Sequence, residues 1–345
     1  MRAKAILRRS MRRVVALLAA VLASASLGTC GDDGAEPGAL QSATLVLDFQ
    51  PNAVHAGIYS ALAHSIYRDA GIDLRVQEPS ASTDAPKLLE AGRADFAILD
   101  IHDLAIARER GLDVVGVMPI VQRPLAAVIA ANRSEIQRPR DLQGRTVGVT
   151  GLPSDDAVLD SVVAADGGDP SQVHRVTIGF NAVADLRAGK LDAATAFWNA
   201  EGVTLKRAGV PIREFRVDDY GAPRYPELVL VTPAATLRKN RSLVGSVVRA
   251  TTRGYVLATA DRATALHDLL DANRALDAGE QRAELRALDE AVAFVPAGRF
   301  TKPLILTWPR WEAAHGIVDR PPDVRRMFDF THSLSDARLI RRSSH

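Results

Sequence analysis

Three short apolar segments of the sequence are each followed directly by polar and aromatic side chains that suit the binding of a small molecule. The segments are 44–47, 96–99 and 193–196, and each has the length and composition of a buried strand. The residues that follow them are Asp48, Phe49, Asn52, His55, Tyr59, Asp100, His102, Trp198, Asn199 and Glu201. Because ligands of open parallel α/β sheets bind beyond the carboxyl ends of the strands, we expect these residues to line one cleft.

Among these residues, the aromatic rings and carboxylates suit a flat nitrogen heterocycle. The indole of Trp198 can stack on such a ring, and Glu201 can read the ring edge. A carboxylate accepts a hydrogen bond from an exocyclic amino group, and in its protonated form it donates one to a ring nitrogen. We expect Asn52 to cap a helix, with His55 one turn on and Tyr59 a turn beyond. The alternative is that all of these residues only cap and pack.

Two further segments offer groups to the same cleft. A helix should begin at Pro153 and Ser154, with its free backbone N–H groups facing the ligand. The carboxylates of Asp155 and Asp156 in its first turn disfavour an anion, so they favour a neutral or weakly cationic ligand. In a later loop, Tyr225 or Glu227 either closes the pocket or packs at a hinge.

Motifs of catalysis and of metal binding are missing from the sequence after residue 30. It has no cysteine there, and no G-x-S-x-G, H-E-x-x-H or P-loop pattern, so we expect neither an enzyme nor a cofactor. Asp100, His102 and Asp103 form a dense polar patch. Three neighbours on one loop rarely make a closed metal site, so we expect no metal.

The first 30 residues differ from the rest of the chain. Six basic residues precede an apolar run at 14–23, and the small residues 24–29 lead to Cys30. This pattern is typical of a signal peptide, since the apolar run is too short to span a bilayer. The segment 27–30 resembles a bacterial lipobox, so we expect a lipid anchor at Cys30. Plain secretion and a chance free thiol are the alternatives.

The charge of the protein depends strongly on this leader. The whole chain has a formal charge of +2. Without the six basic residues of the leader, 37 basic and 41 acidic residues remain, a net charge of −4. This change removes the main support for nucleic-acid binding. Residues 31–43, which are rich in glycine and polar side chains, read as a flexible tether.

From residue 44 onward, short apolar strands alternate with helical patterns, which predicts an α/β fold with mostly parallel sheets flanked by helices. The pattern occurs twice. The segments 44–52 and 146–154 are each a strand that runs into a proline and a good helix N-cap. The segments 91–97 and 188–194 each end a helix at a glycine before a basic residue and a strand. We therefore expect two similar lobes.

Taken in order, these motifs resemble those of the type II periplasmic binding proteins of ABC importers, over roughly residues 44–334. Within that superfamily the chain is most similar to the group of sulfonate, nitrate and thiamine-pyrimidine binders. The segment 48–59 is similar to the D-W-x-P-N-x-x-H-x-G-x-Y opening of proteins that bind the pyrimidine precursor of thiamine, with Phe49 in place of the tryptophan. The W-x-x-E-like stretch from Trp198 to Glu201 carries the same resemblance.

The resemblance implies two lobes that are joined by two crossovers and close on a ligand. We expect the crossovers near 127–131 and 228–232, and we expect the helical segment 241–288 to complete lobe 1. The expected domains are a signal peptide at 1–30, the tether at 31–43, lobe 1 at 44–128 plus 231–335, and lobe 2 at 129–230. Trp308 and Trp311 should pack in lobe 1 or face a permease.

The function that the resemblance implies is capture of a small aromatic nitrogen heterocycle, best matched by an aminopyrimidine precursor of thiamine. The protein would act outside the cytoplasm, as a monomer that serves ABC permease subunits. Riboflavin would use similar residues, whereas sulfonates and nitrate would need more positive charge. A thiamine-pyrimidine synthase of the same fold uses a cysteine-rich motif and a pyridoxal phosphate lysine, and the single cysteine argues against it. A membrane-tethered sensor is a third alternative.

Overall fold

The computed structural model describes residues 39–131, 135–301 and 307–332. The predicted signal peptide, Cys30 and most of the predicted tether lie outside the described residues. The folded body begins at Leu40. None of the helices in the described ranges is long and apolar enough to cross a membrane.

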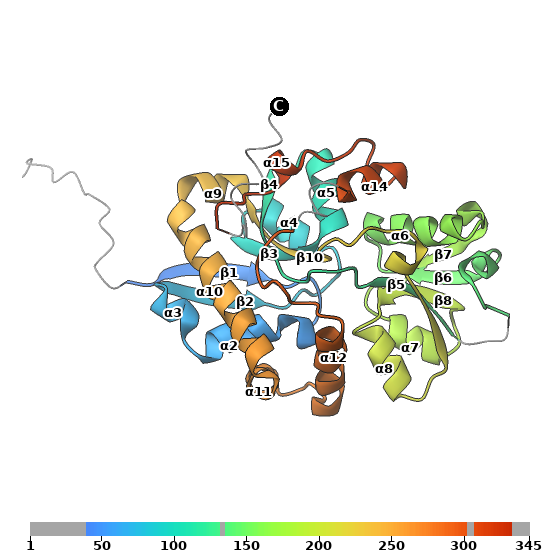
Figure 1. Cartoon of the computed structure of the whole chain (residues 1–345), viewed down its shortest axis with the longest axis horizontal. Helices are drawn as coiled ribbons and strands as arrows, with labels where there is room; N and C mark the ends of the chain where they lie inside the picture. The colour runs from blue at the N-terminus through green and yellow to red at the C-terminus, as the bar shows by residue number, and fades with distance from the viewer. Residues whose placement is uncertain (1–38, 132–134, 302–306, 333–345) are drawn as a thin grey trace, which may run out of the picture. The chain divides into compact units, whose positions relative to one another are not determined.

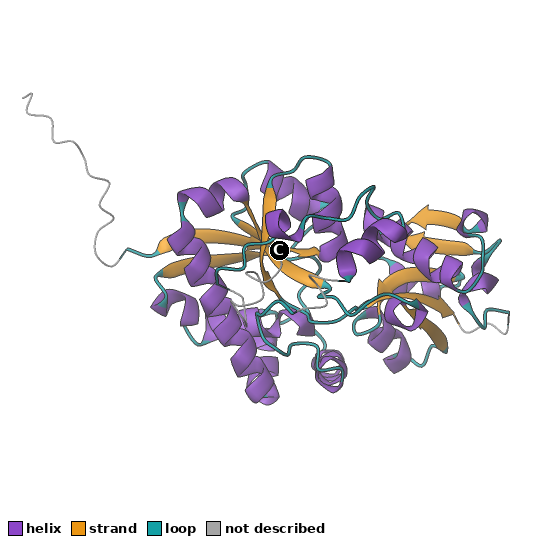
Figure 2. Ribbon diagram, turned by 45° about the horizontal axis from the view of Figure 1, so that its top comes forward, coloured by secondary structure: helices purple, strands orange, loops and turns teal. Residues whose placement is uncertain are grey.

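Two five-stranded sheets form the body, and helices cover both of them (Figures 1 and 2). The first sheet has the order β2 (Ile72–Gln77), β1 (Gln41–Val46), β3 (Phe96–Asp100), β10 (Leu228–Pro233) and β4 (Val114–Pro119). The second has the order β7 (His174–Thr177), β6 (Thr146–Val149), β8 (Ala193–Phe197), β5 (Ala126–Ala131) and β9 (Ile212–Arg216). One strand in each sheet, β10 or β5, is antiparallel to its neighbours, so both sheets are mostly parallel, as predicted.

The helices divide between the two sheets as the chain order requires. Those of the first lobe before the crossover are η1 (Ala53–His55), α2 (Ala56–Ala63), α3 (Ile66–Asp69), α4 (Asp84–Glu90) and α5 (Ile101–Glu109). The second lobe has η2 (Pro139–Leu142), α6 (Pro153–Ala165), η3 (Pro170–Gln172), α7 (Ala182–Arg187), α8 (Glu201–Arg207) and η4 (Val217–Tyr220). After the return come α9 (Ala234–Lys239), α10 (Arg241–Ala260), α11 (Arg262–Ala272), α12 (Ala278–Glu290), α14 (Trp308–Ala314) and α15 (Val324–Met327).

The two crossovers lie a few residues before the predicted positions. The predicted lobe boundaries at 128/129 and 230/231 cut through β5 and β10, each of which belongs wholly to one sheet. The chain therefore changes sheets within 120–125 and 217–227. Both strands are apolar because each lies between two others in its sheet and is buried. Their apolar character marks an interior strand and gives no sign of the connecting segment.

Helix α2, which follows β1 and η1, is held by close packing against the long helix α10. A Cβ built at Gly254 of α10 would lie 2.0 Å from the carbonyl oxygen of Gly57 in α2. Tyr255 packs over Gly57, and its hydroxyl donates to the carbonyl of Val54 at 2.8 Å. The glycine of the opening motif therefore lets α10 fix the position of η1 and α2.

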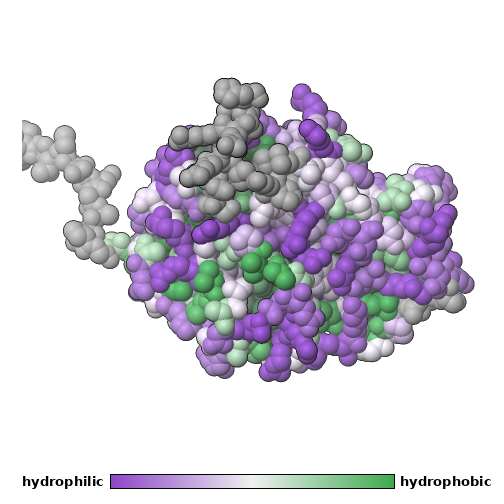
Figure 3. Space-filling model, in the orientation of Figure 1, coloured by the Kyte–Doolittle hydropathy of each residue, from purple (hydrophilic) through white to green (hydrophobic). Residues whose placement is uncertain are grey.

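The surface on the face drawn in Figure 3 is mostly hydrophilic, with small apolar areas between charged residues. Four large hydrophobic residues of the described chain are well exposed: Val176, Val256, Val292 and Val295. Trp308 and Trp311, by contrast, are buried in the first lobe, which confirms the packing alternative for both of them.

Candidate functional site

A pocket of about 1050 Å³, including its open mouth, lies at the carboxyl ends of strands from both sheets. Six of the predicted site residues line it: Asp48, Phe49, Asn52, Asp100, Ser154 and Glu201. Eight others lie outside its lining: His55, Tyr59, His102, Pro153, Trp198, Asn199, Tyr225 and Glu227. The rule that ligands bind beyond strand ends thus gathers residues from both lobes around one space.

At the end of β1, the opening motif holds a carboxylate at the pocket. Asn52 caps η1 as predicted, because its side chain accepts from the Val54 N–H at 2.8 Å. His55 Nδ1 accepts from the Asn52 N–H at 3.2 Å, so its Nε2–H donates to Asp48 at 2.9 Å. The imidazole is fully buried and has both nitrogens engaged. The ring of His55 positions Asp48, and it is Asp48, not His55, that lines the pocket.

At the end of β8, Glu201 begins α8 and accepts from the Phe197 N–H at 3.0 Å. Burial raises the pKa of Glu201 to about 7, and the negative charges of Asp155 and Asp48 add to the rise. At neutral pH this carboxyl is therefore present in both protonation states. It can accept a hydrogen bond or donate one, as the edge of an aminopyrimidine requires.

Two more carboxyls meet at the N-terminus of α6. Asp155 accepts from the Thr150 N–H at 2.6 Å, and Asp103 of α5 hydrogen-bonds Ser154 across the lobes. Burial raises the pKa of Asp103 to about 7, with a further rise from Asp155, although the bonds from Ser154 oppose it. Both carboxyls line the pocket. They therefore increase its negative charge.

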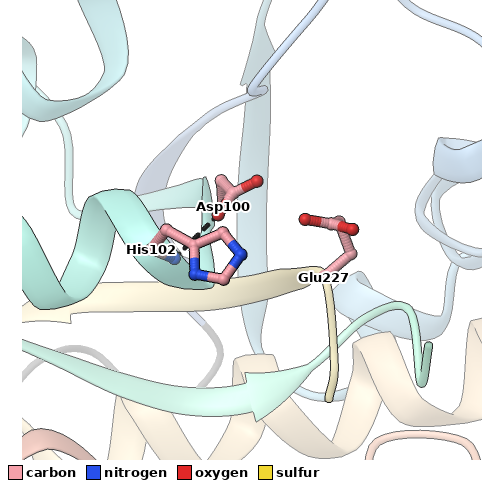
Figure 4. A group of neighbouring side chains, drawn as sticks. All are labelled: Asp100, His102 and Glu227. Atoms are coloured by element: carbon pink, nitrogen blue, oxygen red, sulfur yellow. Dashed lines mark hydrogen bonds between the residues drawn. The ribbon is translucent and has the colours of Figure 1, made fainter. Parts of the chain in front are cut away.

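At the end of β3, Asp100 and Glu227 form a carboxyl pair (Figure 4). Glu227 accepts from the N–H groups of Leu125 and Ala126, at 2.9 Å for the latter, which ties it to the first crossover. Burial raises the pKa of Asp100 well above its usual range, and Glu227 raises it further. Burial also raises the pKa of Glu227 to about 7, although a hydrogen bond from Asp100 opposes the rise. The pair therefore keeps a proton to a higher pH than free carboxyls do.

His102 lies behind this pair, within a buried network. Its Nδ1 is 2.7 Å from Glu312 and its Nε2 is 2.9 Å from the Tyr225 hydroxyl. Burial opposes the charged ring, but the charges of Glu312 and Asp100 outweigh it and raise the pKa of His102 to about 9. One atom from each of Asp100, His102 and Glu227 lies within 4.8 Å of the others, which is close enough to suggest a cation site. Since both ring nitrogens already have partners, the arrangement suits a hydrogen-bond network better than a metal.

Three predicted residues, Trp198, Tyr59 and Asn199, are buried outside the pocket lining. The Trp198 indole donates to the carbonyl of Pro124 at 3.1 Å and lies 4.3 Å from the Arg216 guanidinium, so it packs at the crossover. Tyr59 is buried and hydrogen-bonds Asn273. Asn199 is fully buried, and neither of its amide atoms has a partner in the described part of the chain.

The aromatic rings that do line the pocket are phenylalanines. Phe49 and Phe180 meet edge to face across the lobes, with ring centroids 4.6 Å apart, and Phe197 is a third. Phe197 is the last residue of β8 and Phe180 follows β7, so the strand-end rule points to both. The rarity of tryptophan in the sequence favours Trp198 instead, and that residue lies outside the lining.

Comparison with known proteins identifies the family of this chain and relates its fold to solved structures. Residues 52–265, well over half of the chain, match the family described as "NMT1/THI5 like". The chain belongs to this family. A formylaminopyrimidine-binding protein of Halalkalibacterium halodurans is 34% identical over 246 residues, which cover 70% of this chain and 73% of the relative.

The family also contains enzymes. A 4-amino-5-hydroxymethyl-2-methylpyrimidine phosphate synthase of Legionella pneumophila is 26% identical over 219 residues, which cover 63% of this chain and 69% of the synthase. Among solved structures, the alkanesulfonate-binding protein of Xanthomonas axonopodis pv. citri bound to MOPS aligns with a TM-score of 0.68 at 17% identity, covering 86% of this chain and 99% of that one. The likeness to this structure shows the periplasmic-binding-protein fold, as the sequence predicts.

Proposed function

We propose that the protein is an extracytoplasmic solute-binding lipoprotein that captures an aminopyrimidine related to the thiamine precursor and delivers it to an ABC importer. The observation that carries the proposal is that one pocket is lined both by Glu201, whose pKa is raised to about 7, and by phenylalanines of both lobes. The rings offer apolar faces and edges on which a flat heterocycle can pack, and the carboxyl reads its amino group and ring nitrogen. The relative that binds formylaminopyrimidine supports the same ligand class.

Binding is proposed to act through closure of the lobes. The pocket takes residues from both sheets, so a ligand within it binds the closed form better than the open one. The shift towards the closed form is what a permease would recognise. Anchoring rests on the leader and Cys30, and a Cys30→Ala variant should move the protein from the membrane fraction to the soluble fraction.

The synthase is the alternative from another class. Pyridoxal phosphate chemistry requires a lysine, and none of the described residues that line the pocket is a lysine. The chain's single cysteine, Cys30, lies in the predicted leader. Incubation with pyridoxal phosphate should therefore give neither an aldimine absorbance band nor a pyrimidine product.

The ligand class is tested by thermal unfolding of the purified protein with 4-amino-5-hydroxymethyl-2-methylpyrimidine, riboflavin and MOPS in parallel. A ligand at a hundred times its Kd stabilises the folded state by about 2.7 kcal/mol. We expect a rise in Tm with the pyrimidine alone. A rise with riboflavin or MOPS but not with the pyrimidine would reject the proposed ligand.

A further inference from the structure

The N-terminus of α6 opens on the pocket, where the end of a helix ordinarily attracts an anion. The N-cap position is Leu152, whose side chain cannot accept a hydrogen bond, so this helix has no cap of its own. In this structure carboxyls of the chain already occupy the region. Asp103 reaches Ser154 from the other lobe, and Asp155 is fixed by Thr150.

The rest of the lining makes the pocket still less suited to an anion. Five acidic side chains line it, and among its described residues none is Lys, Arg or His. These five are Asp48, Asp100, Asp103, Asp155 and Glu201. Behind Asp100, the fully buried Glu227 has an Oε1 atom that receives no donor unless Asp100 carries a proton. The described lining therefore offers five acidic side chains and no basic one to a ligand, which suits a ligand with hydrogen-bond donors or positive charge better than an anion.

We propose that Asp103 and Asp155 are specificity-determining residues that close the α6 N-terminus to anions, so that the pocket accepts an unphosphorylated aminopyrimidine and rejects its phosphate monoester. This inference rests on the proposed function. It assigns the discrimination to two residues on facing lobes, which approach each other when the pocket closes. The cell must then supply any phosphate group after uptake, by a phosphoryl-transfer reaction.

Two mechanisms make the rejection strong. A phosphate monoester brings a charge near −2 beside carboxyls in a half-buried site, where water screens repulsion poorly. The ester also cannot gain the helix-end donors, because Asp103 already holds Ser154. Burial raises the pKa of Asp103 to about 7, with a smaller rise from the charge of Asp155, so a further negative charge beside these carboxyls would be poorly stabilised.

The test is isothermal titration of the wild-type protein with 4-amino-5-hydroxymethyl-2-methylpyrimidine and with its phosphate monoester at pH 7.5 and low salt. The ester should bind at least about a hundredfold more weakly. Asp103→Asn and Asp155→Asn should each reduce the preference for the neutral pyrimidine over the ester about tenfold, measured as the ratio of the two Kd values in the same variant. Equal affinity of the wild type for the two compounds would overturn the inference.

Asp156→Asn is the matched control. Asp156 follows Asp155 on the same helix, but its side chain is exposed, pairs with Arg175 at 3.1 Å and lies outside the pocket lining. It should leave both affinities unchanged. Changes in ester binding no larger for the two test variants than for this control would contradict the assignment to Asp103 and Asp155.

Inorganic phosphate tests the same residues without any pyrimidine. The wild-type protein should show no phosphate-dependent rise in Tm, whereas the Asp103→Asn, Asp155→Asn double variant should show one. If the wild type binds neither pyrimidine compound, the proposed function fails, and this arm still decides the inference. A double variant that responds to phosphate no more than the wild type would refute it.

Discussion

The two lobes share a strand order, yet the ends of their matching strands β3 and β8 do different work in the pocket. At the β3 end, His102 holds Glu312 and Tyr225 through its two ring nitrogens, and Glu227 is tied to the crossover through one oxygen. At the β8 end, the side-chain amide of Asn199 has no hydrogen-bond partner among the described residues, and Glu201, which lines the pocket, accepts from the Phe197 N–H. The first end therefore holds the pocket in shape, whereas the second is free to read a ligand.

The largest expected effect is a loss of unfolding free energy when the network at the β3 end is broken. His102→Ala leaves Glu312 and Tyr225 buried without their partner, which should cost about 3–5 kcal/mol of unfolding free energy. Urea unfolding measures it. His174→Ala on the exposed part of β7 is the control and should cost less than about 0.5 kcal/mol. Equal effects of the two substitutions would show that the network adds little stability.

The next largest effect is on affinity, at the β8 end. Glu201→Gln keeps an oxygen for the Phe197 N–H but loses the charge and the titratable proton of the carboxyl, and with them the charge-assisted bond to the amino group, so the pyrimidine should bind at least about tenfold more weakly. The unfolding free energy without ligand should not fall, because a buried carboxyl is removed. Titration calorimetry and urea unfolding separate the two quantities. Glu290→Gln, at an exposed position of α12, should change neither.

The free energy of unfolding should depend moderately on pH. Burial raises the pKa of Glu201 and of Glu227 to about 7 and that of Glu284 to about 8, so between pH 5 and 8 the folded protein binds more protons than the unfolded chain. The stability that these groups contribute is fully present below the unfolded pKa of about 4.5 and is lost progressively as pH rises through the folded values of 7 to 8. His102, raised to about 9, acts in the same direction.

The measurement for this prediction is the free energy of unfolding without ligand at pH 5.5 and at pH 8. The value should be lower at pH 8. Glu227→Gln and Glu201→Gln should each reduce the difference, which divides the pH dependence between the two strand ends. A protein more stable at pH 8 than at pH 5.5 would contradict the assignment of raised pKa values to these carboxyls.

The smallest effect should come from Trp198. Its indole packs on Arg216 and donates to Pro124 outside the pocket lining, so Trp198→Phe should change pyrimidine affinity by less than about threefold. Phe180→Ala, which removes a ring from the lining, should weaken binding about tenfold. Titration of both variants decides which aromatic side chains contact the ligand. A larger loss for the tryptophan variant would restore the stacking hypothesis.

The sequence predicts the architecture well because strand ends, glycine caps and prolines are local signals. Asp48, Asp100 and Glu201 could be found from their positions after strands, and they line one pocket. The direction of a side chain depends on distant partners instead. His55 lies behind Asp48 because the backbone N–H of Asn52 donates to its Nδ1. The Trp198 indole donates to the carbonyl of Pro124, which is 74 residues away in the sequence. Asp103 meets Ser154 through packing of two lobes, which no local pattern reveals.

The most direct test of the account is native mass spectrometry of the protein purified without unfolding, followed by release and identification of any small molecule that remains bound. The account predicts an adduct with the mass of an unphosphorylated aminopyrimidine, present in wild-type protein and reduced in Glu201→Gln. A bound flavin, sulfonate or phosphate ester in its place would contradict it.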